Sequence, residues 1–248
     1  MPTTHTVFDG YGLINESRKN FLKAIMPSLI AECGLNTGLD VGCGVGFFSQ
    51  WLSEAGLKVK AFDARAESVQ EANKRYPRVE FYVDDLEKPK RLEVSASDLV
   101  LCFGLLYHLE NPFLAIRHLH SLTKKVSIIE SMIAPYSSPS AVLIDETKGI
   151  DQALNYVAFV PSEACLVKMI YRVGFPHVYR AAPLPKHTDF MTTLEHKRRR
   201  TILVASKSRL SPPMFRELRE VFVSDVWERK PVRMMRKIVS LRARLIGE

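Results

Sequence analysis

Long apolar runs are missing from this sequence, and so are the residue patterns that hold metals. No apolar stretch in the 248 residues approaches the roughly 18 residues that a membrane-spanning helix needs. Residues 1–10 are polar and lack the apolar core of a secretory signal. No cysteine pair has C-x-x-C spacing, and His118 and His120 would point in different directions on a helix. We therefore expect a cytoplasmic protein with no transmembrane segment and no metal site, and with four reduced cysteines: Cys33, Cys43, Cys102 and Cys165.

Repeats, low-complexity segments and hydrolase motifs are absent as well. The chain contains no G-x-S-x-G nucleophile turn and no paired-carboxylate motif, so the common hydrolase classes are disfavoured. What is present is an ordinary globular composition, with 46% hydrophobic residues, 12 glycines and 14 prolines. This length and composition suit one α/β domain with modest additions.

Positive charge is concentrated at one end of the chain. Residues 196–248 hold 15 of the 35 Lys and Arg but only 5 of the 27 Asp and Glu, so the preceding part is close to neutral. A basic end of this kind fits an anionic partner, such as nucleic acid, acidic lipid or a phosphorylated substrate. It fits equally well a solvated helix with a basic surface.

Short β-rich apolar runs alternate with helical patterns through the middle of the chain. We predict helices at 47–55, 65–75, 111–122 and 161–173, and strands at 38–41, 58–63, 79–83, 98–103, 125–131, 177–181 and 201–206. Strands that alternate with helices of this length favour an α/β fold, with a mostly parallel sheet covered by helices on both faces.

The two ends of the chain have a helical pattern. We expect residues 1–33 to form a helical lead-in with an amphipathic helix at 17–30, and residues 34–207 to form the main domain. After the break at Ser211-Pro212-Pro213, residues 208–248 are expected to form a basic extension with helices at 215–227 and 232–246.

The stretch from Leu39 to Gly46 ends a predicted strand and opens a helix. Its glycines Gly42, Gly44 and Gly46, with Cys43 between them, allow a sharp turn and a close approach of backbone to a ligand. In the NAD fingerprint the third small residue comes one position later, where this chain has Phe47. The carboxylate of Asp40 would repel a pyrophosphate but suit the ammonium of an amino acid, directly or through water. The ligand that fits is S-adenosylmethionine (SAM).

Acidic residues also end the next two predicted strands. Asp63, beside Ala64, can accept hydrogen bonds from both ribose hydroxyls, a feature that NAD enzymes share. The third strand ends in Asp84-Asp85-Leu86, where Asp85 is favoured to accept from the adenine amine and Leu86 to pack against the ring. A single acidic strand end is often a helix cap, but three beside a glycine loop favour a nucleoside site.

These motifs resemble those of the class I SAM-dependent methyltransferases. The segment 40–46 is similar to their first motif, and the segment from Asp98 to Pro112 is similar to their fourth strand and its loop. The resemblance covers roughly residues 10–207. It implies a Rossmann-like sheet of seven strands whose last strand is antiparallel, together with SAM as cofactor.

A narrower resemblance points to the tRNA wobble-uridine carboxymethyltransferase family, which transfers a carboxymethyl group from carboxy-SAM. It is carried by Gly10–Asn15, Leu105-Leu106-Tyr107-His108 and the segment 155–162 with Gly174-Phe175. This chain lacks that family's long N-terminal extension, whose basic and tryptophan residues help to hold the extra carboxylate. We therefore interpret the chain as a divergent relative that uses SAM itself, with carboxy-SAM as the less favoured cofactor.

The residues after the fourth predicted strand are the candidates for catalysis. His108 lies where ligands bind in such folds, and an unperturbed histidine pKa of about 6.5 suits proton removal near neutrality. It is equally a candidate for bonding backbone in the loop. Tyr107 can orient the acceptor or pack in the core. Phe103 and Gly104 are expected beside the methionine part of SAM, and Tyr11 is expected to close over the pocket.

The acceptor side is less constrained by the sequence. Asn155, Tyr156 and Ser162 precede the predicted helix 161–173 and are candidates to line it, although Ser162 also reads as an ordinary helix start. The tetrad Phe103-Gly104-Leu105-Leu106 replaces the N-P-P-Y tetrad of base and amide N-methyltransferases, which disfavours those acceptors.

Three functions follow as hypotheses. The first is methyl transfer to a hydroxyl, or less readily an amine, of a small-molecule or glycan-type acceptor. The second is modification of tRNA, favoured by the basic run 196–200 and the basic end of the chain. The third is a SAM-binding or RNA-binding subunit without turnover.

Overall fold

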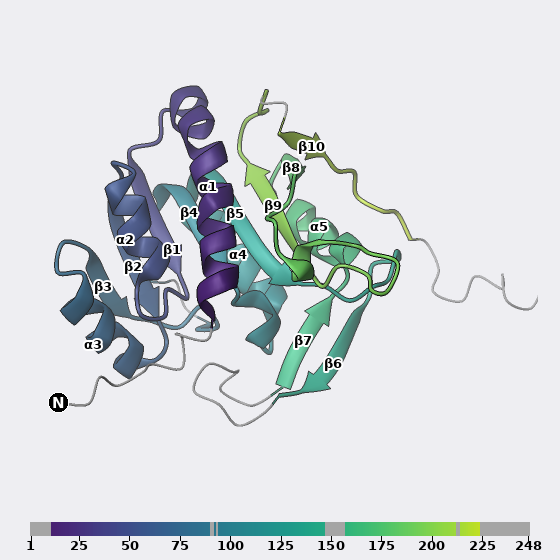
Figure 1. Ribbon diagram of the computed structural model, residues 1–248, viewed down its shortest axis with the longest axis horizontal. Helices are drawn as coiled ribbons and strands as arrows, with labels where there is room; N and C mark the ends of the chain where they lie inside the picture. The colour runs from purple at the N-terminus through teal and green to yellow at the C-terminus, as the bar shows by residue number, and fades with distance from the viewer. Residues whose placement is uncertain (1–10, 90–91, 93, 147–156, 212–213, 224–248) are drawn as a thin grey trace, which may run out of the picture.

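The computed structural model describes residues 11–89, 92, 94–146, 157–211 and 214–223. Within them an eight-stranded sheet has the order β10-β8-β9-β5-β4-β1-β2-β3 (Figure 1). The strands of this sheet are β1 (Thr37–Val41), β2 (Lys58–Asp63), β3 (Glu80–Val83), β4 (Ser97–Phe103), β5 (Thr123–Met132), β8 (His177–Ala181), β9 (Arg200–Ser206) and β10 (Phe215–Glu217). The five strands from β3 to β5 pair in parallel, and β9 lies antiparallel between β5 and β8. The predicted α/β class is confirmed.

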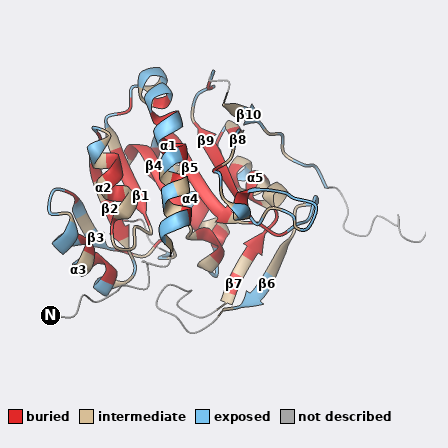
Figure 2. Ribbon diagram, in the orientation of Figure 1, coloured by how far each residue is buried: buried red, intermediate tan, exposed pale blue. Residues whose placement is uncertain are grey.

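Helices cover both faces of the sheet, as the alternation of patterns predicts. The helices are α1 (Gly12–Cys33), α2 (Phe47–Glu54), α3 (Ala66–Arg75), α4 (Pro112–Leu122) and α5 (Glu163–Arg172). Apolar side chains of α1 and α2 pack in one core cluster with one face of the strands, and those of α4 and α5 pack in a second cluster. Figure 2 shows the central strands buried between these layers. All seven residues of β4 and of β9 are buried, as expected for strands with helices on either side.

The order of the strands reverses between β1 and β4, both of which run parallel to their neighbours. β2 follows on one side of β1, whereas β4 and β5 follow on the other. Ligands of open α/β sheets bind outside the carboxyl ends of strands at such a switch point. The glycine loop follows β1 and the His108 loop follows β4, so both candidate motifs lie at this edge.

One strand near the end of the described residues, β10, differs from the expectation. The predicted helix 215–227 is wrong where the structure describes it, because Phe215–Glu217 is a strand paired antiparallel with β8. The open edge of β8 offers backbone hydrogen bonds, and Phe215 lies 6.2 Å from the ring of Tyr179, so tertiary pairing overrides the local helical pattern. The sheet therefore has eight strands rather than seven. The predicted helix 232–246 lies outside the described residues.

A hairpin was not foreseen at all. Strands β6 (Ala141–Asp145) and β7 (Val157–Pro161) pair antiparallel and form a separate two-stranded sheet, which projects beneath β9 in the view of Figure 1. Pro161 ends β7, so α5 begins at Glu163 and not at residue 161. The residues between the two strands, 147–156, lie outside the described part.

The helical lead-in belongs to the main core. Leu22, Ile25 and Leu29 of α1 are fully buried in the same cluster as the strands. The helix ends at Gly34, whose positive φ of 59° suits the turn that leads into β1. The boundaries proposed from sequence, 1–33, 34–207 and 208–248, stay predictions.

Candidate active site

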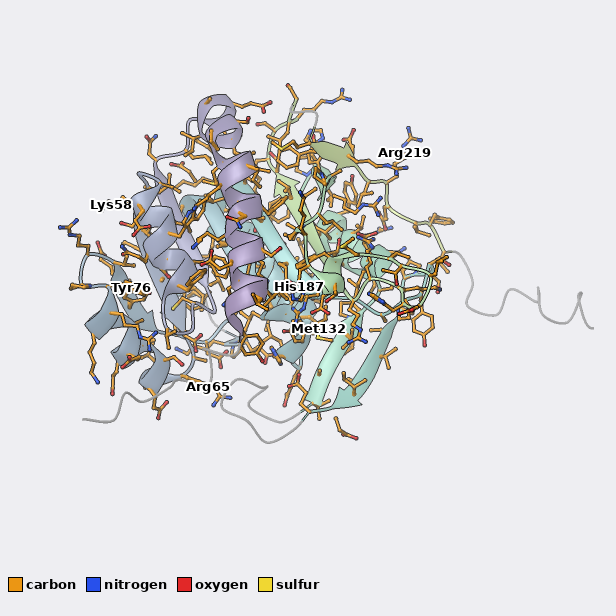
Figure 3. All side chains as sticks on the ribbon, viewed as in Figure 1. Lys58, Arg65, Tyr76, Met132, His187 and Arg219 are labelled. Atoms are coloured by element: carbon orange, nitrogen blue, oxygen red, sulfur yellow. The ribbon has the colours of Figure 1, made fainter. Side chains whose placement is uncertain are left out.

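A cavity of about 900 Å³ opens at the switch point. Its walls come from the start of α1, the glycine loop, the ends of β2 and β3, the loop after β4 and the start of β9. In Figure 3 Arg65, one of its lining residues, lies at the lower edge of the sheet, toward which the N-terminal end of α1 points. The predicted site residues that line it are Tyr11, Gly42, Cys43, Gly44, Asp63, Ala64, Asp84, Asp85, Leu86, Phe103, Gly104, Tyr107 and His108.

The glycine loop is held against the end of β2. The backbone N–H of Gly44 donates to the carboxylate of Asp63 over 2.9 Å, and the N–H of Arg65 donates to its other oxygen over 2.9 Å. A Cβ on Gly42 would lie 2.7 Å from Leu105, and the backbone there has a positive φ of 69°. Only glycine fits this position without displacing the loop that carries His108. Burial raises the pKa of Asp63.

Asp40 lies behind the loop and does not line the cavity. It is 2% exposed, and its carboxylate accepts a hydrogen bond of 2.6 Å from the Ser49 hydroxyl. Burial raises the pKa of Asp40 to about 7, although the hydrogen bond from Ser49 acts to lower it. Gly46 also lies off the cavity, and a Cβ there would lie 2.8 Å from Phe81. Direct contact of either residue with a ligand is not favoured, so Gly46 serves the packing of the loop.

The end of β3 presents carboxylates and an apolar side chain. Asp84 accepts a 2.6 Å bond from Lys88, and Asp85 accepts the backbone N–H of Glu87 over 2.9 Å. Leu86 is 3% exposed and its carbonyl lies 2.8 Å from the Nδ1 of His118. The turn thus fixes all three predicted residues against the cavity.

A buried ionic cluster lies beside Gly104 in the wall of the cavity. Glu130 of β5 is fully buried and accepts from Arg18 over 2.9 Å and from Arg200 over 3.1 Å. Arg200 also donates to the Tyr107 hydroxyl over 3.1 Å. Burial opposes ionisation of Glu130, but the charges of Arg18 and Arg200 outweigh it and hold its pKa below the ordinary value. Both arginines line the cavity.

The loop after β4 carries the candidate catalytic pair. A 3-10 turn, η2 (Leu106–His108), places Tyr107 and His108 side by side with ring centroids 4.0 Å apart. Nδ1 of His108 lies 2.9 Å and 3.0 Å from the two carboxylate oxygens of Glu146. Burial raises the pKa of Tyr107, so its hydroxyl stays protonated.

Comparison with known proteins identifies this arrangement. Residues 39–129 match the family described as methyltransferase domain. The chain carries a methyltransferase domain. The tRNA U34 carboxymethyltransferase of Haemophilus influenzae is 26% identical over 192 residues, which span 74% of this chain and 56% of that protein. The chain therefore spans about half the length of the curated relatives that it matches.

Solved structures show the same fold. The N-terminal domain of EvdMO1 with S-adenosylhomocysteine bound has a TM-score of 0.58 at 17% identity, over 77% of this chain and 79% of that one. Magnesium protoporphyrin IX methyltransferase from Synechocystis PCC 6803 with bound SAM has a TM-score of 0.55 at 23% identity, over 79% and 82%. At these identities the likeness confirms the predicted fold, and the matched methyltransferase domain supports the predicted enzyme class.

Ser162, one of the three predicted acceptor residues, does not line the cavity. Ser162 is fully buried, donates to the carbonyl of Ser138 over 2.7 Å and accepts the N–H of Cys165 over 3.1 Å. It is the cap of α5, so its assignment to the acceptor side is wrong and the alternative interpretation as a helix start holds. Asn155 and Tyr156 lie outside the described residues.

Sequence reasoning missed Arg18, Glu130, Arg200 and Glu146. Two of them carried a signal. Arg18 interrupts the apolar face of an amphipathic helix, and Glu130 interrupts the apolar strand 125–131. A charge on a buried face needs a partner, so the two together predict a buried ion pair. Arg200 gave no signal because it belongs to the basic run 196–200, a composition typical of solvent-exposed surface. Glu146 gave none because it follows a strand of the hairpin that was not predicted.

Membrane-spanning helices and metal-ligand clusters are both absent among the described residues. No helix among the described residues is long and apolar enough to cross a membrane. In the same part of the chain, no three His, Cys, Asp or Glu side chains lie close enough to hold a metal ion.

Proposed function

We propose that this chain transfers the methyl group of SAM to a hydroxyl of a small-molecule acceptor, with an amine as the less favoured acceptor. The observation that carries the proposal is a single cavity with two chemically different ends. One end has the glycine loop, Asp63 and Asp85, and the other has Tyr107 and His108. A volume of about 900 Å³ is ample for a nucleoside with a small acceptor beside it.

The residues at the first end fit SAM. Carboxylates of Asp63 and Asp85 suit the ribose hydroxyls and the adenine amine, and Leu86 offers an apolar surface to the ring. The Nε of Arg18 is buried and has no hydrogen-bond partner among the described residues, although Arg18 lines the cavity. We propose that Arg18, whose guanidinium lies beside Gly104, binds the carboxylate of the methionine part where the two ends of the cavity meet. Asp40 acts on the ammonium through water, and Tyr11 covers the bound cofactor.

The residues at the second end fit removal of a proton. SAM, when bound, would supply a methyl group on a sulfonium: the acceptor oxygen would form the new C–O bond and the electron pair of the C–S bond would stay with sulfur. His108 takes the proton that the acceptor oxygen loses. Tyr107, held by Arg200, orients the acceptor. Alignment and exclusion of water supply the rest of the rate enhancement.

Carboxymethyl transfer to tRNA is the second candidate, favoured by the name of the Haemophilus influenzae relatives. A guanidinium near Tyr107 could hold the added carboxylate of carboxy-SAM. However, all three nitrogens of Arg200 are engaged, by Glu130, Tyr107 and, at 3.4 Å, Asp189. Of the basic run 196–200, Arg198 also bonds inward, to Glu163. These contacts support SAM and a small acceptor.

The deciding experiment offers the chain methyl-labelled SAM with a small-molecule extract and, separately, with bulk tRNA. We expect label in the extract. Label in tRNA supports the second candidate, as does calorimetric binding of carboxy-SAM tighter than that of SAM. Binding of SAM without label in either mixture contradicts transfer and leaves the non-catalytic hypothesis.

We also propose a cytoplasmic location, which the four free cysteines support. The basic segment 208–248 is proposed to contact an anionic partner. Most of it lies outside the described residues.

A further inference from the structure

We propose that Glu146 is a positioning residue for transfer, because its carboxylate holds the imidazole of His108 in the orientation and tautomer that accepts the acceptor's proton. The inference rests on the proposed function. Nothing in the sequence near residue 146 marks it as part of a site, and it lies 38 residues from His108 along the chain.

The contact itself has the geometry of a built pair. Both carboxylate oxygens lie within 3.0 Å of Nδ1. The two side chains are nearly buried, at 14% exposed for His108 and 8% for Glu146. Charged hydrogen bonds are stronger when they are screened from water, so this pair restrains the ring more than a surface pair could.

The hairpin holds the carboxylate in place. Glu146 directly follows β6, whose partner β7 buries Ala158 and Val160 in a small cluster with Tyr107 and Ala134. Met132, at the end of β5, packs against this cluster and is labelled beside the hairpin in Figure 3. The hairpin thus packs against Tyr107 of η2 and places Glu146 in contact with His108. This gives the hairpin a role in the site although it contributes nothing to the main sheet.

The pair defines which nitrogen can act as base. An ionised carboxylate only accepts hydrogen bonds, so Nδ1 carries the hydrogen and the lone pair of the neutral ring lies on Nε2. His108 lines the cavity. The proton that leaves the acceptor oxygen goes to Nε2, and the resulting imidazolium is stabilised by the negative charge of Glu146. The proton then passes to solvent after the product leaves.

Other charged groups near His108 must be included in any pH effect. Glu110 lies in the same loop and lines the cavity, as does Arg200 of β9. Arg200 is compensated by Glu130, and Tyr107 beside the ring stays neutral. The carboxylate of Glu146 is hydrogen-bonded to the ring of His108, so its replacement should have the largest effect on the titration of His108.

The test compares Glu146→Gln and Glu146→Asp with the matched control Asp145→Asn. Asp145 is exposed on the same hairpin, so its variant loses the same charge one residue away. The first measurement follows the His108 ring by NMR in the full chain, assigned by its loss in His108→Asn. We expect the titration midpoint to fall by about one pH unit in Glu146→Gln, because the opposite charge is removed. It should stay in place in Asp145→Asn.

The second measurement uses the acceptor that the labelling experiment identifies. In Glu146→Gln we expect kcat to fall about tenfold or more with KM little changed, and the acidic limb of the pH profile to move with the NMR midpoint. Glu146→Asp should recover part of the activity. SAM affinity and the unfolding midpoint, measured on the same samples, should match the wild type, which separates positioning from damage to the fold.

The outcomes are distinguishable. Unchanged NMR midpoint and pH profile in Glu146→Gln, with wild-type SAM binding and label transfer intact, overturn the role of Glu146 alone. Loss of SAM binding or of the fold in this variant makes Glu146 structural and also overturns the inference. If the wild type binds SAM but transfers no label, the inference falls together with the proposed function.

Discussion

The two ends of the cavity are built from different kinds of chain segment. The adenosyl end uses residues between 39 and 86, which follow three strands in sequence order. The acceptor end brings together Arg18, Glu130 and Arg200 with the 107–108 pair, from four distant parts of the chain. A site whose residues follow successive strands can be recognised along the sequence, whereas a site assembled by packing leaves only weak signals, such as a charge on a buried face.

The electrostatics of the two ends differ in the same way. At the adenosyl end burial raises the pKa of Asp40 and of Asp63, and the charge of Arg65 opposes the shift of Asp63 only in part. At the acceptor end Glu130 is fully compensated by two arginines. The first end therefore suits a ligand with donors and positive charge, while at the second end Glu130 already has its cations in the free protein and only the Nε of Arg18 lacks a partner among the groups of the described cluster. Four experiments test this contrast.

The largest expected effect is on stability, at the acceptor end. Glu130→Gln leaves the buried guanidinium of Arg18 without its counter-charge and leaves Arg200 with only the more distant carboxylate of Asp189. We expect a loss of about 3–5 kcal/mol in the free energy of unfolding, measured by urea denaturation. The control Glu163→Gln removes a partly exposed carboxylate that bonds Arg180 and Arg198, and should cost about 1 kcal/mol. Equal losses in the two variants would contradict a special role of burial.

Glu130 also predicts a pH dependence. Its folded pKa is below its unfolded value, so its contribution to stability is present above the unfolded pKa of about 4.3. The contribution is lost as the pH falls through the folded pKa. The stability difference between wild type and Glu130→Gln should therefore shrink when unfolding is measured below about pH 4.

The second effect is on cofactor binding, at the adenosyl end. Gly44→Arg fills the cavity beside Asp63 and should weaken SAM by at least about 100-fold, or nearly 3 kcal/mol, in calorimetry. Gly44→Ala adds one carbon to a backbone with a positive φ of 52° and should have a smaller effect from strain alone. Unchanged SAM affinity in the arginine variant would remove the cofactor from this loop.

The fold was largely predictable because its elements have strong local patterns. β2 and β8 have the bounds that their apolar runs predict, and β1, β4, β5 and β9 differ by one or two residues. The hairpin runs 141–145 and 157–161 contain β-branched and aromatic residues and could have been recognised as strands, whereas β10 has no such pattern of its own. Phe215–Glu217 becomes a strand through the open edge of β8, and β6 has three exposed residues among its five.

The site was predictable where a motif lies along one stretch of chain. Gly42, Gly44, Asp63 and Asp85 follow from spacing alone. Ser162 was misplaced because a serine before a helix is chemically suited to both a cap and a ligand, and only burial decides between them. Arg200 was hidden because a run of basic residues does not tell which side chain turns inward.

The third effect separates binding from catalysis. Asp63→Ala removes both the proposed ribose acceptor and the bonds that hold the N–H groups of Gly44 and Arg65, so SAM should bind about 10–30-fold more weakly in calorimetry. Asp63→Asn keeps one acceptor oxygen and should lose less. His108→Ala should bind SAM as the wild type does but transfer no label. If His108→Ala weakens SAM more than Asp63→Ala does, the assignment of the two ends is reversed.

The smallest effect concerns Asp40, which the cavity does not reach directly. Burial raises its pKa to about 7, so the group loses its proton only as the pH rises through neutrality. Its folded pKa exceeds its unfolded value; its contribution to stability is therefore full below about pH 4 and is lost as the pH rises toward 7.

Cofactor binding should follow the opposite direction, because the ammonium of SAM favours the ionised carboxylate of Asp40. Between pH 6 and pH 7.5 the affinity for SAM should rise about three- to fivefold in the wild type. In Asp40→Asn, which can still accept the hydrogen bond from Ser49, the affinity should be lower and should not depend on pH over this interval. Calorimetry on both proteins across the interval measures the difference, and parallel slopes would mean that Asp40 shapes the glycine loop without sensing the charge of the ligand.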